Sequence, residues 1–389
     1  MIQERKSRKG AVAGLIFAAA VLLLVVLLEN LSTFLGTGAV PSIFLPTSQL
    51  FSVLKKAAVY SLVAVSMNLL NGFTGLFSLG QAGFMLLGAY TYAILTVPMS
   101  AKDTVYYLYG GSAVPFSLPD LFGGLDTPTG LILGVVLAIL LGGCVAAFFA
   151  FLIGLPVLRL KSDYLAIATL GFAEIIRAFF QWDALGPITN GSNLLRRFPT
   201  FSSVLFPFAV SGLCIAIIVM LVNSSYGRAF KAIRDDEIAA EAMGIDLFKH
   251  KQMSFVISSF FAGVSGALLA MYQTTVQASA FKSAMTYEIL LIVVIGGIGS
   301  ISGSCIASFL FIACNEWWLR FLDNEMYIGA WQVPLLRTGF RKVVFSVIIM
   351  AVVLFYRQGI MGDRELSVQR MARLVQRRTK AARTGGKEG

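Results

Sequence analysis

Apolar blocks close to twenty residues long recur through this chain, and they limit its fold more than any other feature. A helix of that length crosses the roughly 30 Å hydrocarbon core of a bilayer. The chain is 57% hydrophobic and 13% charged, whereas a soluble domain carries about 25% charged residues. These observations predict an all-α integral membrane protein with several transmembrane helices.

We predict about ten transmembrane helices from these blocks. The blocks at 286–299 and 303–320 are separated by only three residues, which predicts a tight helical hairpin. The block at 11–28 follows a basic start, as in a signal peptide. Its 18 apolar residues exceed a signal-peptide core of about 7–15 residues, so we expect a retained helix. The full set is 11–28, 51–70, 82–98, 130–154, 163–182, 206–223, 253–272, 286–299, 303–320 and 341–357.

Lysine and arginine residues fall unevenly on the two sides of the predicted membrane. With the N-terminus inside, the inside segments hold 20 basic residues and the outside segments hold 10. Cytoplasmic loops carry the excess of basic residues, so we expect both termini inside. The connections 99–129 and 183–205 are rich in Gly, Pro, Ser and Asp, and we expect folded outer loops there. The expected regions are a cytoplasmic N-terminus (1–10), a transmembrane domain (11–357) with a long inside loop (224–252), and a basic cytoplasmic tail (358–389) near anionic lipid headgroups.

Sequence signals for several functional classes are missing. The net charge is +11, but no soluble basic domain is present to bind nucleic acid. The four cysteines lie in apolar stretches without CxxC spacing, and His250 is the single histidine, so no metal site is predicted. No HExxH or GxSxG motif supports an enzyme, and we assign no catalytic residue. The only Gly-Lys step, Gly386-Lys387, is followed by Glu, so the chain has no phosphate loop for ATP.

Two polar, glycine-rich stretches interrupt the predicted spans, at 68–83 and 295–303. Non-helical backbone at membrane depth survives only when it is buried in protein or lines a cavity. The first stretch is therefore either a broken helix beside a solute pathway or an ordinary inside turn, and both interpretations remain open. For the second we favour close helix packing through Gly299 and Gly303, as for the small residues around Gly263. The candidate pathway residues in the two stretches are Asn68, Asn71, Gly75, Ser78, Gln81, Gly296, Gly297 and Gly299.

Glu174 and Arg177 are charged residues inside the predicted span 163–182. Three residues apart, they share one face of a helix and can pair. An ionisable group inside a membrane is costly unless it is paired or wetted, so it suggests a functional site. The pair either lines the solute route or is a structural pair near the outer end. An ion-coupled transporter would need more buried carboxylates than Glu174 alone.

The longest inside loop contains a candidate docking helix. From Arg228 to Met243 it has no Pro or Gly, and Ala and Glu are plentiful, which favours one continuous helix. Gly244 is well placed to end that helix. A helix that projects from a membrane bundle favours docking on a partner, and the alternative is a solvated helix on the membrane surface.

This loop resembles the coupling loop of ABC importer permeases, whose signature is Glu-Ala-Ala, three residues and then Gly. Ala239, Ala240 and Gly244 match the signature, whereas Ile238 stands in place of its Glu. The stretch AIRDDEIAAEAMGID is similar to the form found in branched-chain amino acid permeases of the LivM type. The likeness covers about 55–360. The further segments that resemble this family, in the same order, are MNLLNGFTGLFSLGQAGFMLLGAY (67–90), DYLAIATLGFAEIIR (163–177), GPITNGSNLL (186–195) and VIGGIGSISGS (294–304).

The resemblance implies the membrane subunit of an ATP-driven importer in a bacterial or archaeal cell membrane. The family carries leucine, isoleucine and valine, and related importers carry urea or short amides. The implied partners are a similar permease subunit in a heterodimer, two cytoplasmic ATPases that hold ATP and magnesium, and an external solute-binding protein. No cofactor is expected on this chain. The residues implied to couple it to the ATPases are Arg228, Arg234, Ala239, Ala240, Glu241 and Gly244.

Overall fold

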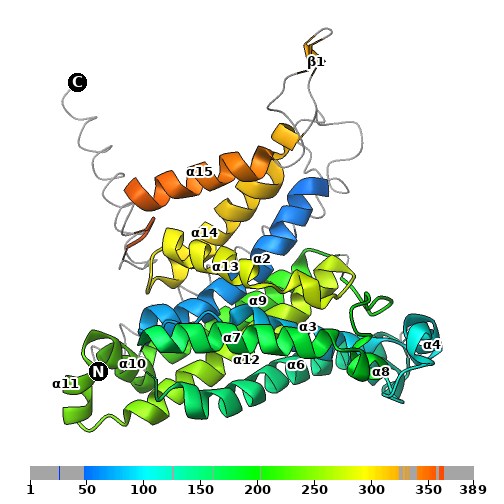
Figure 1. Ribbon diagram of the computed structural model, residues 1–389, viewed down its shortest axis with the longest axis horizontal. Coiled ribbons are helices and arrows are strands. Elements are labelled where there is room, and N and C mark those ends of the chain that lie inside the picture. The colour runs from blue at the N-terminus through cyan, green and yellow to red at the C-terminus, as the bar shows by residue number, and fades with distance from the viewer. Residues whose placement is uncertain are drawn as a thin grey trace, which may run out of the picture.

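The structure is a computed structural model that describes residues 26, 48–124, 127–160, 162–201, 203–323, 327–328, 331–332, 340–355 and 359–362. The predicted N-terminus, almost all of the predicted first span and most of the basic tail lie outside these residues. Within the described residues the chain is helical, with one antiparallel pair of two-residue strands (Figure 1). The all-α prediction is therefore confirmed for this part of the chain, apart from that short pair.

The elements follow one another along the chain with short connections. Those before residue 224 are α2 (Ser48–Asn68), a π-helix (Leu69–Phe73), α3 (Gln81–Thr96), α4 (Met99–Val105), a 3-10 turn (Tyr107–Tyr109), α5 (Leu118–Leu121), α6 (Pro128–Val157), α7 (Ser162–Gln181), a 3-10 turn (Asp183–Leu185), α8 (Gly186–Thr189) and α9 (Leu205–Asn223). Those after it are α10 (Ser225–Asp235), α11 (Glu237–Ala242), α12 (Leu247–Gln273), a 3-10 turn (Ala278–Ala280), α13 (Ser283–Gly296), α14 (Ile301–Ala313), a π-helix (Cys314–Trp318), a 3-10 turn (Arg320–Asp323), β1 (Tyr327–Ile328), β2 (Trp331–Gln332) and α15 (Phe340–Phe355).

Every predicted span from 51–70 onward coincides with a helix. Five described helices are long and apolar enough to cross a membrane, and α3 with α4 makes a sixth if the two count as one span bent by 119°. α13 and α14 have only 14 and 13 residues, a length of about 20 Å at 1.5 Å per residue. The chain thus has several membrane-crossing helices, and the number of ten stays a prediction.

α12 forms the centre of the bundle and packs against α6, α3 and α2. In its most apolar stretch 78% of the residues are buried, against 22% in α9. Glycines allow this close packing: a Cβ atom on Gly88 of α3 would lie 1.9 Å from the Gly263 carbonyl oxygen of α12. A Cβ on Gly263 would in turn lie 2.7 Å from Ala146 of α6. The packing predicted for the small residues around Gly263 is therefore confirmed.

The bundle has two distinct ends, which we call the α11 end and the α4 end. Figure 1 shows α7 running between them, with α10 and α11 at the left and α4 and α8 at the right. At the α4 end the two long connections are folded and joined: Tyr109 donates a hydrogen bond to Asp183 (2.9 Å), which raises the pKa of Tyr109. The buried Lys102 ammonium donates to the carbonyls of Val114 (2.8 Å) and Phe116 (2.5 Å).

α13 and α14 form the predicted hairpin. A Cβ atom on Gly303 would lie 2.1 Å from the Gly296 carbonyl oxygen, so these two glycines let the helices meet. Gly299, which was expected to pack with Gly303, lies instead in the turn with φ +87°. That part of the packing prediction is wrong, because the chain needs a left-handed residue to reverse direction there. After α15 the chain returns to the hairpin, where the Ile360 amide donates to the Ile295 carbonyl (2.8 Å).

Candidate functional site

The first glycine-rich stretch breaks the helix that begins as α2. The π-helix Leu69–Phe73 follows α2 directly, and a turn with Gly75 at φ +77° leads into α3. Asn71 and Ser78 close this turn: the Ser78 amide donates to Asn71 Oδ1 (3.2 Å) and Asn71 Nδ2 donates to the Ser78 carbonyl (3.4 Å). The helix therefore breaks here, and the break is also the turn toward α3, while its place beside a solute pathway stays a prediction.

The start of α3 is held by buried hydroxyl groups from four other helices. Gln81 Nε2 donates to Ser66 Oγ (2.9 Å) and to Ser258 Oγ (3.4 Å). Neighbouring main-chain amides, which lack partners within the first helical turn, donate to the hydroxyls of Thr169 (3.0 Å) and Thr286 (3.1 Å). These four hydroxyl residues are not predicted from the sequence, since a single hydroxyl in an apolar helix carries no spacing signal.

Asn68, at the end of α2, is fully buried and hydrogen-bonds to the turn between α13 and α14. Its Oδ1 accepts a hydrogen bond from the Gly299 amide (2.8 Å). Its Nδ2 donates to the Ser300 carbonyl (3.0 Å), to Ser304 Oγ (2.9 Å) and, at 3.4 Å, to the Gly297 carbonyl. The structure therefore joins the two glycine-rich stretches that the sequence singled out separately.

Arg234 of α10, in the loop 224–252, contacts the break after α2 and the turn between α13 and α14. Its Nη1 donates to the Gly72 carbonyl at the break after α2 (3.1 Å). A Cβ atom on Gly75 would lie 3.0 Å from Arg234 Cγ, and one on Gly299 would lie 3.2 Å from Nη1. The guanidinium also pairs with Asp235 (3.0 Å). Arg234 thus packs between the break after α2 and the turn between α13 and α14.

The predicted continuous helix from Arg228 to Met243 is wrong, because the chain breaks at Asp236. α10 ends before this residue and α11 begins after it. Asp236 is extended, with φ −160°, and its carboxylate accepts hydrogen bonds from two main-chain amides in the first turn of α11 (2.9 and 3.0 Å). An N-cap of this kind starts a new helix, so the acidic run begins a second, short helix.

α11 ends at Gly244, as predicted. Gly244 has φ +85°, and its amide donates to the Glu241 carbonyl (2.9 Å). The amide of the next residue donates to the Ala240 carbonyl (3.1 Å). These two bonds form a Schellman motif, which needs a left-handed residue at this position.

Two large apolar side chains are exposed on α11 and at its end. Ile238 is 82% exposed and Met243 is 83% exposed, although large apolar side chains usually leave water. The residues predicted to couple the chain to a partner fall into two groups. Arg228, Arg234, Ala239, Glu241 and Gly244 are exposed, whereas Ala240 is buried. Arg234 also contacts the membrane helices through its guanidinium.

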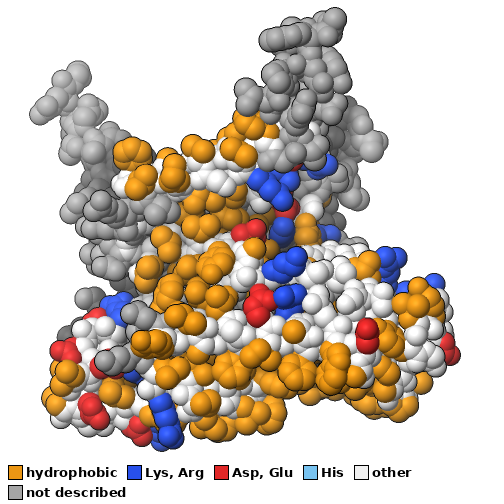
Figure 2. Space-filling model, in the orientation of Figure 1, with side chains coloured by type: hydrophobic (Ala, Val, Ile, Leu, Met, Phe, Trp, Pro, Cys, Tyr) orange, Lys and Arg blue, Asp and Glu red, His pale blue; other side chains and the backbone are white. Residues whose placement is uncertain are grey.

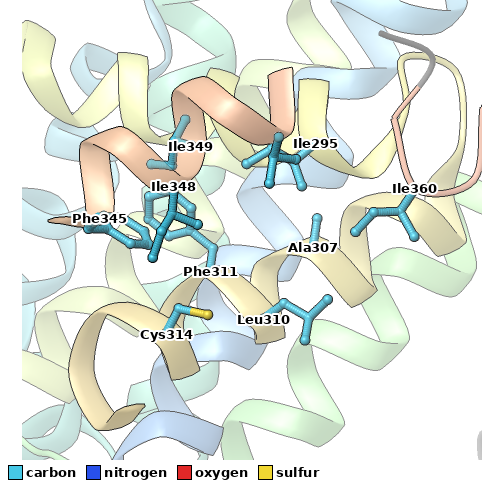
Figure 3. Close-up of a pocket in the computed structure, with 10 residues that line it drawn as sticks. Ile295, Ala307, Leu310, Phe311, Cys314, Phe345, Ile348, Ile349 and Ile360 are labelled. Carbon is cyan, nitrogen blue, oxygen red and sulfur yellow. The ribbon is translucent and has the colours of Figure 1, made fainter. Parts of the chain in front are cut away.

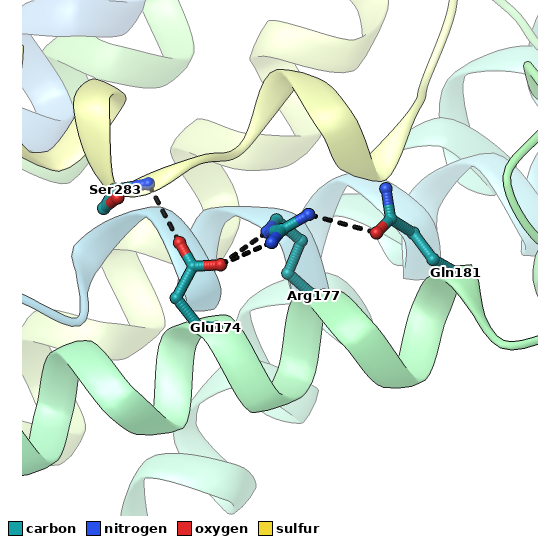
Figure 4. Close-up of polar contacts among 4 residues, drawn as sticks. All are labelled: Glu174, Arg177, Gln181 and Ser283. Carbon is teal, nitrogen blue, oxygen red and sulfur yellow. Dashed lines mark hydrogen bonds and ion pairs between the residues drawn. The ribbon is translucent and has the colours of Figure 1, made fainter.

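Glu174 and Arg177 form the predicted ion pair on α7, away from the Arg234 site. Arg177 Nη2 lies 2.6 Å from Glu174 Oε2, and Arg177 Nη1 donates to Gln181 Oε1 (3.0 Å). The other carboxylate oxygen accepts from the Ser283 amide (3.2 Å), at the start of α13 (Figure 4). Glu174 therefore both pairs with Arg177 and caps the positive end of a helix. Its side chain is still 36% exposed.

Charged side chains cross one face of an otherwise largely apolar molecule, from α7 toward the helices above it (Figure 2). By contrast α6 and α9 contain no Asp, Glu, Lys or Arg. Three ion pairs within the chain lie among the charges near α7 and the upper helices. The pairs are Glu174–Arg177, Lys56–Glu316 and Asp323–Arg341.

A pocket of about 260 Å³ lies between α13, α14, α15 and Ile360 (Figure 3). Its lining is apolar: every lining side chain is a hydrocarbon except that of Cys314, which carries a thiol. A charged or zwitterionic solute would find no polar partner there. Among the described residues, no group of three His, Cys, Asp or Glu side chains is placed to hold a metal ion.

Comparison with known proteins agrees with the resemblance seen in the sequence. The sequence profile of the family described as "Branched-chain amino acid transport system / permease component" matches residues 49–356. The chain is similar to the "High-affinity branched-chain amino acid transport system permease protein LivM" of Salmonella typhimurium and of Escherichia coli K12. The first is 31% and the second 30% identical over 302 residues, and each match covers 69% of this chain. The chain spans 63% of the length of these two relatives.

A second type of relative is also similar. The "Probable branched-chain amino acid transport permease protein LivH" of Methanocaldococcus jannaschii is 26% identical over 288 residues, which cover 70% of this chain and 85% of the relative. No solved structure gives a significant match.

Proposed function

The chain belongs to the family of branched-chain amino acid transport permease components, and on this premise we propose that it is the membrane-spanning subunit of an ATP-driven importer for branched-chain amino acids. Two relatives, at 31% and 30% identity, carry this transport in their names. The absence of a phosphate loop supports an energy source on separate ATPase subunits, which would bind ATP and magnesium.

The single structural observation that carries the coupling role is the outer side of α11. Ile238 and Met243 are exposed on a short, well-capped helix that projects from one end of the bundle (Figure 1). Two apolar side chains on such a helix gain free energy when a partner covers them. We therefore propose that α11 docks on an ATPase subunit, and that the α11 end is the cytoplasmic end.

The complete assembly would contain further subunits. The similarity to both LivM and LivH proteins supports a second permease subunit of the same family, in a heterodimer. An extracytoplasmic solute-binding protein would deliver the amino acid at the α4 end. The proposed location is a bacterial or archaeal cell membrane, with ten crossings and both termini inside.

The proposed solute route follows the charged face of α7. α6 and α9 carry no charge and have many exposed apolar side chains, which suits contact with lipid. A partly exposed Glu174–Arg177 pair on a lipid face would be costly, so we place that face against water or the second permease subunit. An amino acid carries both charges, and a paired acid and base offers a partner for each. The candidate residues at the α11 end would form the inner end of the same route.

Two alternatives use the same fold with a different solute or energy source. A related importer for urea or short amides would keep the ATPases but would not need a charged pair on the route. An ion-coupled transporter would need no ATPase, but Glu174 is the only acidic residue predicted deep within a span.

A purification and an uptake assay test the proposal together. A tag on this chain should recover two ATPase subunits and a second permease from native membranes. Vesicles that hold this complex, with the solute-binding protein outside and ATP inside, should accumulate labelled leucine and exclude labelled urea. Accumulation of solute against a gradient by this polypeptide alone would reject the proposal, and uptake of urea instead of leucine would reject the substrate.

A further inference from the structure

The site at the α11 end contains a compact set of residues that we call the Arg234 joint: Asn68, Gly72, Gly75, Arg234 and Gly299. It brings together three segments that are far apart in the sequence, namely the break after α2, the inside loop and the turn between α13 and α14. Two hydrogen-bonded links hold it, from Arg234 to Gly72 (3.1 Å) and from Asn68 to Gly299 (2.8 Å).

A side chain at any of these glycines would meet a neighbouring residue, and the packing is tightest at the buried Gly72. A Cβ atom on Gly72 would lie 1.9 Å from Asn68 Oδ1 and 2.5 Å from the Gly299 amide nitrogen. Gly75 and Gly299 have φ values of +77° and +87°, and a Cβ on either would meet Arg234 at 3.0 or 3.2 Å. Close-packed contacts of this kind transmit a displacement instead of absorbing it.

The loop that carries Arg234 also contacts the rest of the chain elsewhere. Phe230 and Ile233 of α10 and Ala240 of α11 are buried, and Glu237 of α11 pairs with Lys251 (2.7 Å). The Arg234 guanidinium differs from these contacts because it lies against both the break after α2 and the turn between α13 and α14. A displacement of α11 that moves Arg234 therefore acts on both membrane segments at once.

From this geometry we propose that Arg234 is a positioning residue for transport, which moves the break after α2 and the turn between α13 and α14 together when α11 moves. This inference rests on the proposed function, because it assumes that an ATPase moves α11. In this proposal Arg234 contacts the membrane helices, whereas Ile238 and Met243 contact the ATPase. Coupling between two sites requires a structural element with two arrangements, and both sites must shift the equilibrium between those arrangements.

The first test uses Arg234→Gln in the complete complex, reconstituted with its ATPases, second permease and solute-binding protein. Lys249→Gln is the matched control, because it removes an exposed basic charge from the same loop. We expect Arg234→Gln to retain both ATPases and to hydrolyse ATP, with leucine uptake per ATP reduced at least tenfold. Arg234→Lys, which keeps the charge and one donor toward Gly72, should recover part of that loss.

The second test follows the movement itself. Ile298 is 51% exposed in the turn between α13 and α14, so a fluorophore on Ile298→Cys, with the four native cysteines replaced by serine, reports on that turn. Addition of ATP and vanadate should change its fluorescence in the otherwise unmodified complex and with Lys249→Gln, and should leave it unchanged with Arg234→Gln.

The outcomes separate the two proposals. Uptake per ATP within twofold of the Lys249→Gln control, or an intact fluorescence change, would show that Arg234 does not position these segments while the importer assignment stands. If Arg234→Gln does not assemble, the comparison is made with Arg234→Lys, and wild-type uptake in that variant together with wild-type fluorescence would overturn the inference. If no ATPase is recovered with the unmodified chain, the proposed function fails and this inference fails with it.

Discussion

Asn68 shows at the scale of one residue how a buried polar group orders this protein. It is 0% exposed, and both ends of its carboxamide are used on the turn between α13 and α14. Asn68→Ala would leave the Gly299 amide without its partner, at about 1–3 kcal/mol, and would remove the hydrogen bonds that the carboxamide donates to the same turn. We expect a loss of about 3 kcal/mol in the free energy of unfolding, seen as a lower thermal midpoint in detergent.

The control for this change is Asn71→Ala. Among the described residues the Asn71 side chain bonds to Ser78 alone, seven residues further along the chain, so its loss should lower the midpoint much less. Equal midpoints for the two variants would show that the carboxamide of Asn68 does not hold the turn.

Glu174 gives the second prediction at the residue scale. Glu174→Gln keeps an acceptor for the Ser283 amide but removes the charge that faces Arg177. We expect normal assembly with the ATPases and leucine uptake lowered about tenfold, because the solute would lose its acidic partner on the route; tenfold equals about 1.4 kcal/mol. Asp103→Asn, which neutralises an exposed carboxylate at the α4 end, is the control. Normal uptake in Glu174→Gln would reduce the pair to a structural role.

At the scale of elements, the close crossing of α3, α6 and α12 depends on glycines, which have no side chain. Gly88→Val should force α3 away from α12, since even a Cβ atom would lie 1.9 Å from the Gly263 carbonyl oxygen. We expect little or no folded protein in detergent by size-exclusion chromatography. Gly212→Ala on α9 has open space around its Cβ and should fold as well as the parent or slightly better. A folded Gly88→Val variant would contradict this packing.

The short helix α11 makes a prediction about coupling. Gly244→Leu places a branched side chain at φ +85°, a conformation that costs about 1–2 kcal/mol per residue outside glycine. We expect the membrane bundle to fold, ATP hydrolysis to continue and uptake per ATP to fall several-fold, because α11 no longer ends in its Schellman motif. Gly244→Asn should retain more uptake, since Asn tolerates this conformation. Unchanged uptake in Gly244→Leu would argue against docking through α11.

At the scale of the whole molecule, the proposed orientation can be measured directly. Tyr107 is 70% exposed at the α4 end and Met243 is 83% exposed at the α11 end. In a chain without its native cysteines, Tyr107→Cys should react with a membrane-impermeant maleimide on intact cells, and Met243→Cys only in inverted vesicles. Labelling of both positions from the same side would overturn the two-ended arrangement.

The sequence by itself determined the membrane class, the positions of the helices and the family. Blocks of apolar residues decide the membrane class and the helix positions locally, because a helix satisfies its own backbone hydrogen bonds and needs no partner to exist in lipid. The family follows from short motifs such as the one that contains Ala239, Ala240 and Gly244. Gly244 was predicted as a helix end for the same local reason. The break at Asp236 is not predicted from the sequence. Helix propensity favours one continuous helix there, but the Asp236 side chain caps the start of a second helix instead.

Only the tertiary structure decided which polar residues meet. Asn68, Arg234 and Gly299 were each singled out in the sequence, but nothing in their spacing indicated that they form one joint. Contacts between residues more than 60 positions apart depend on how helices cross, and the crossing is set by small residues such as Gly88 and Gly263 that fit together only in three dimensions. The periodicity of apolar residues along the sequence does not indicate which helices fit together, so the Arg234 joint could be identified only in the folded chain.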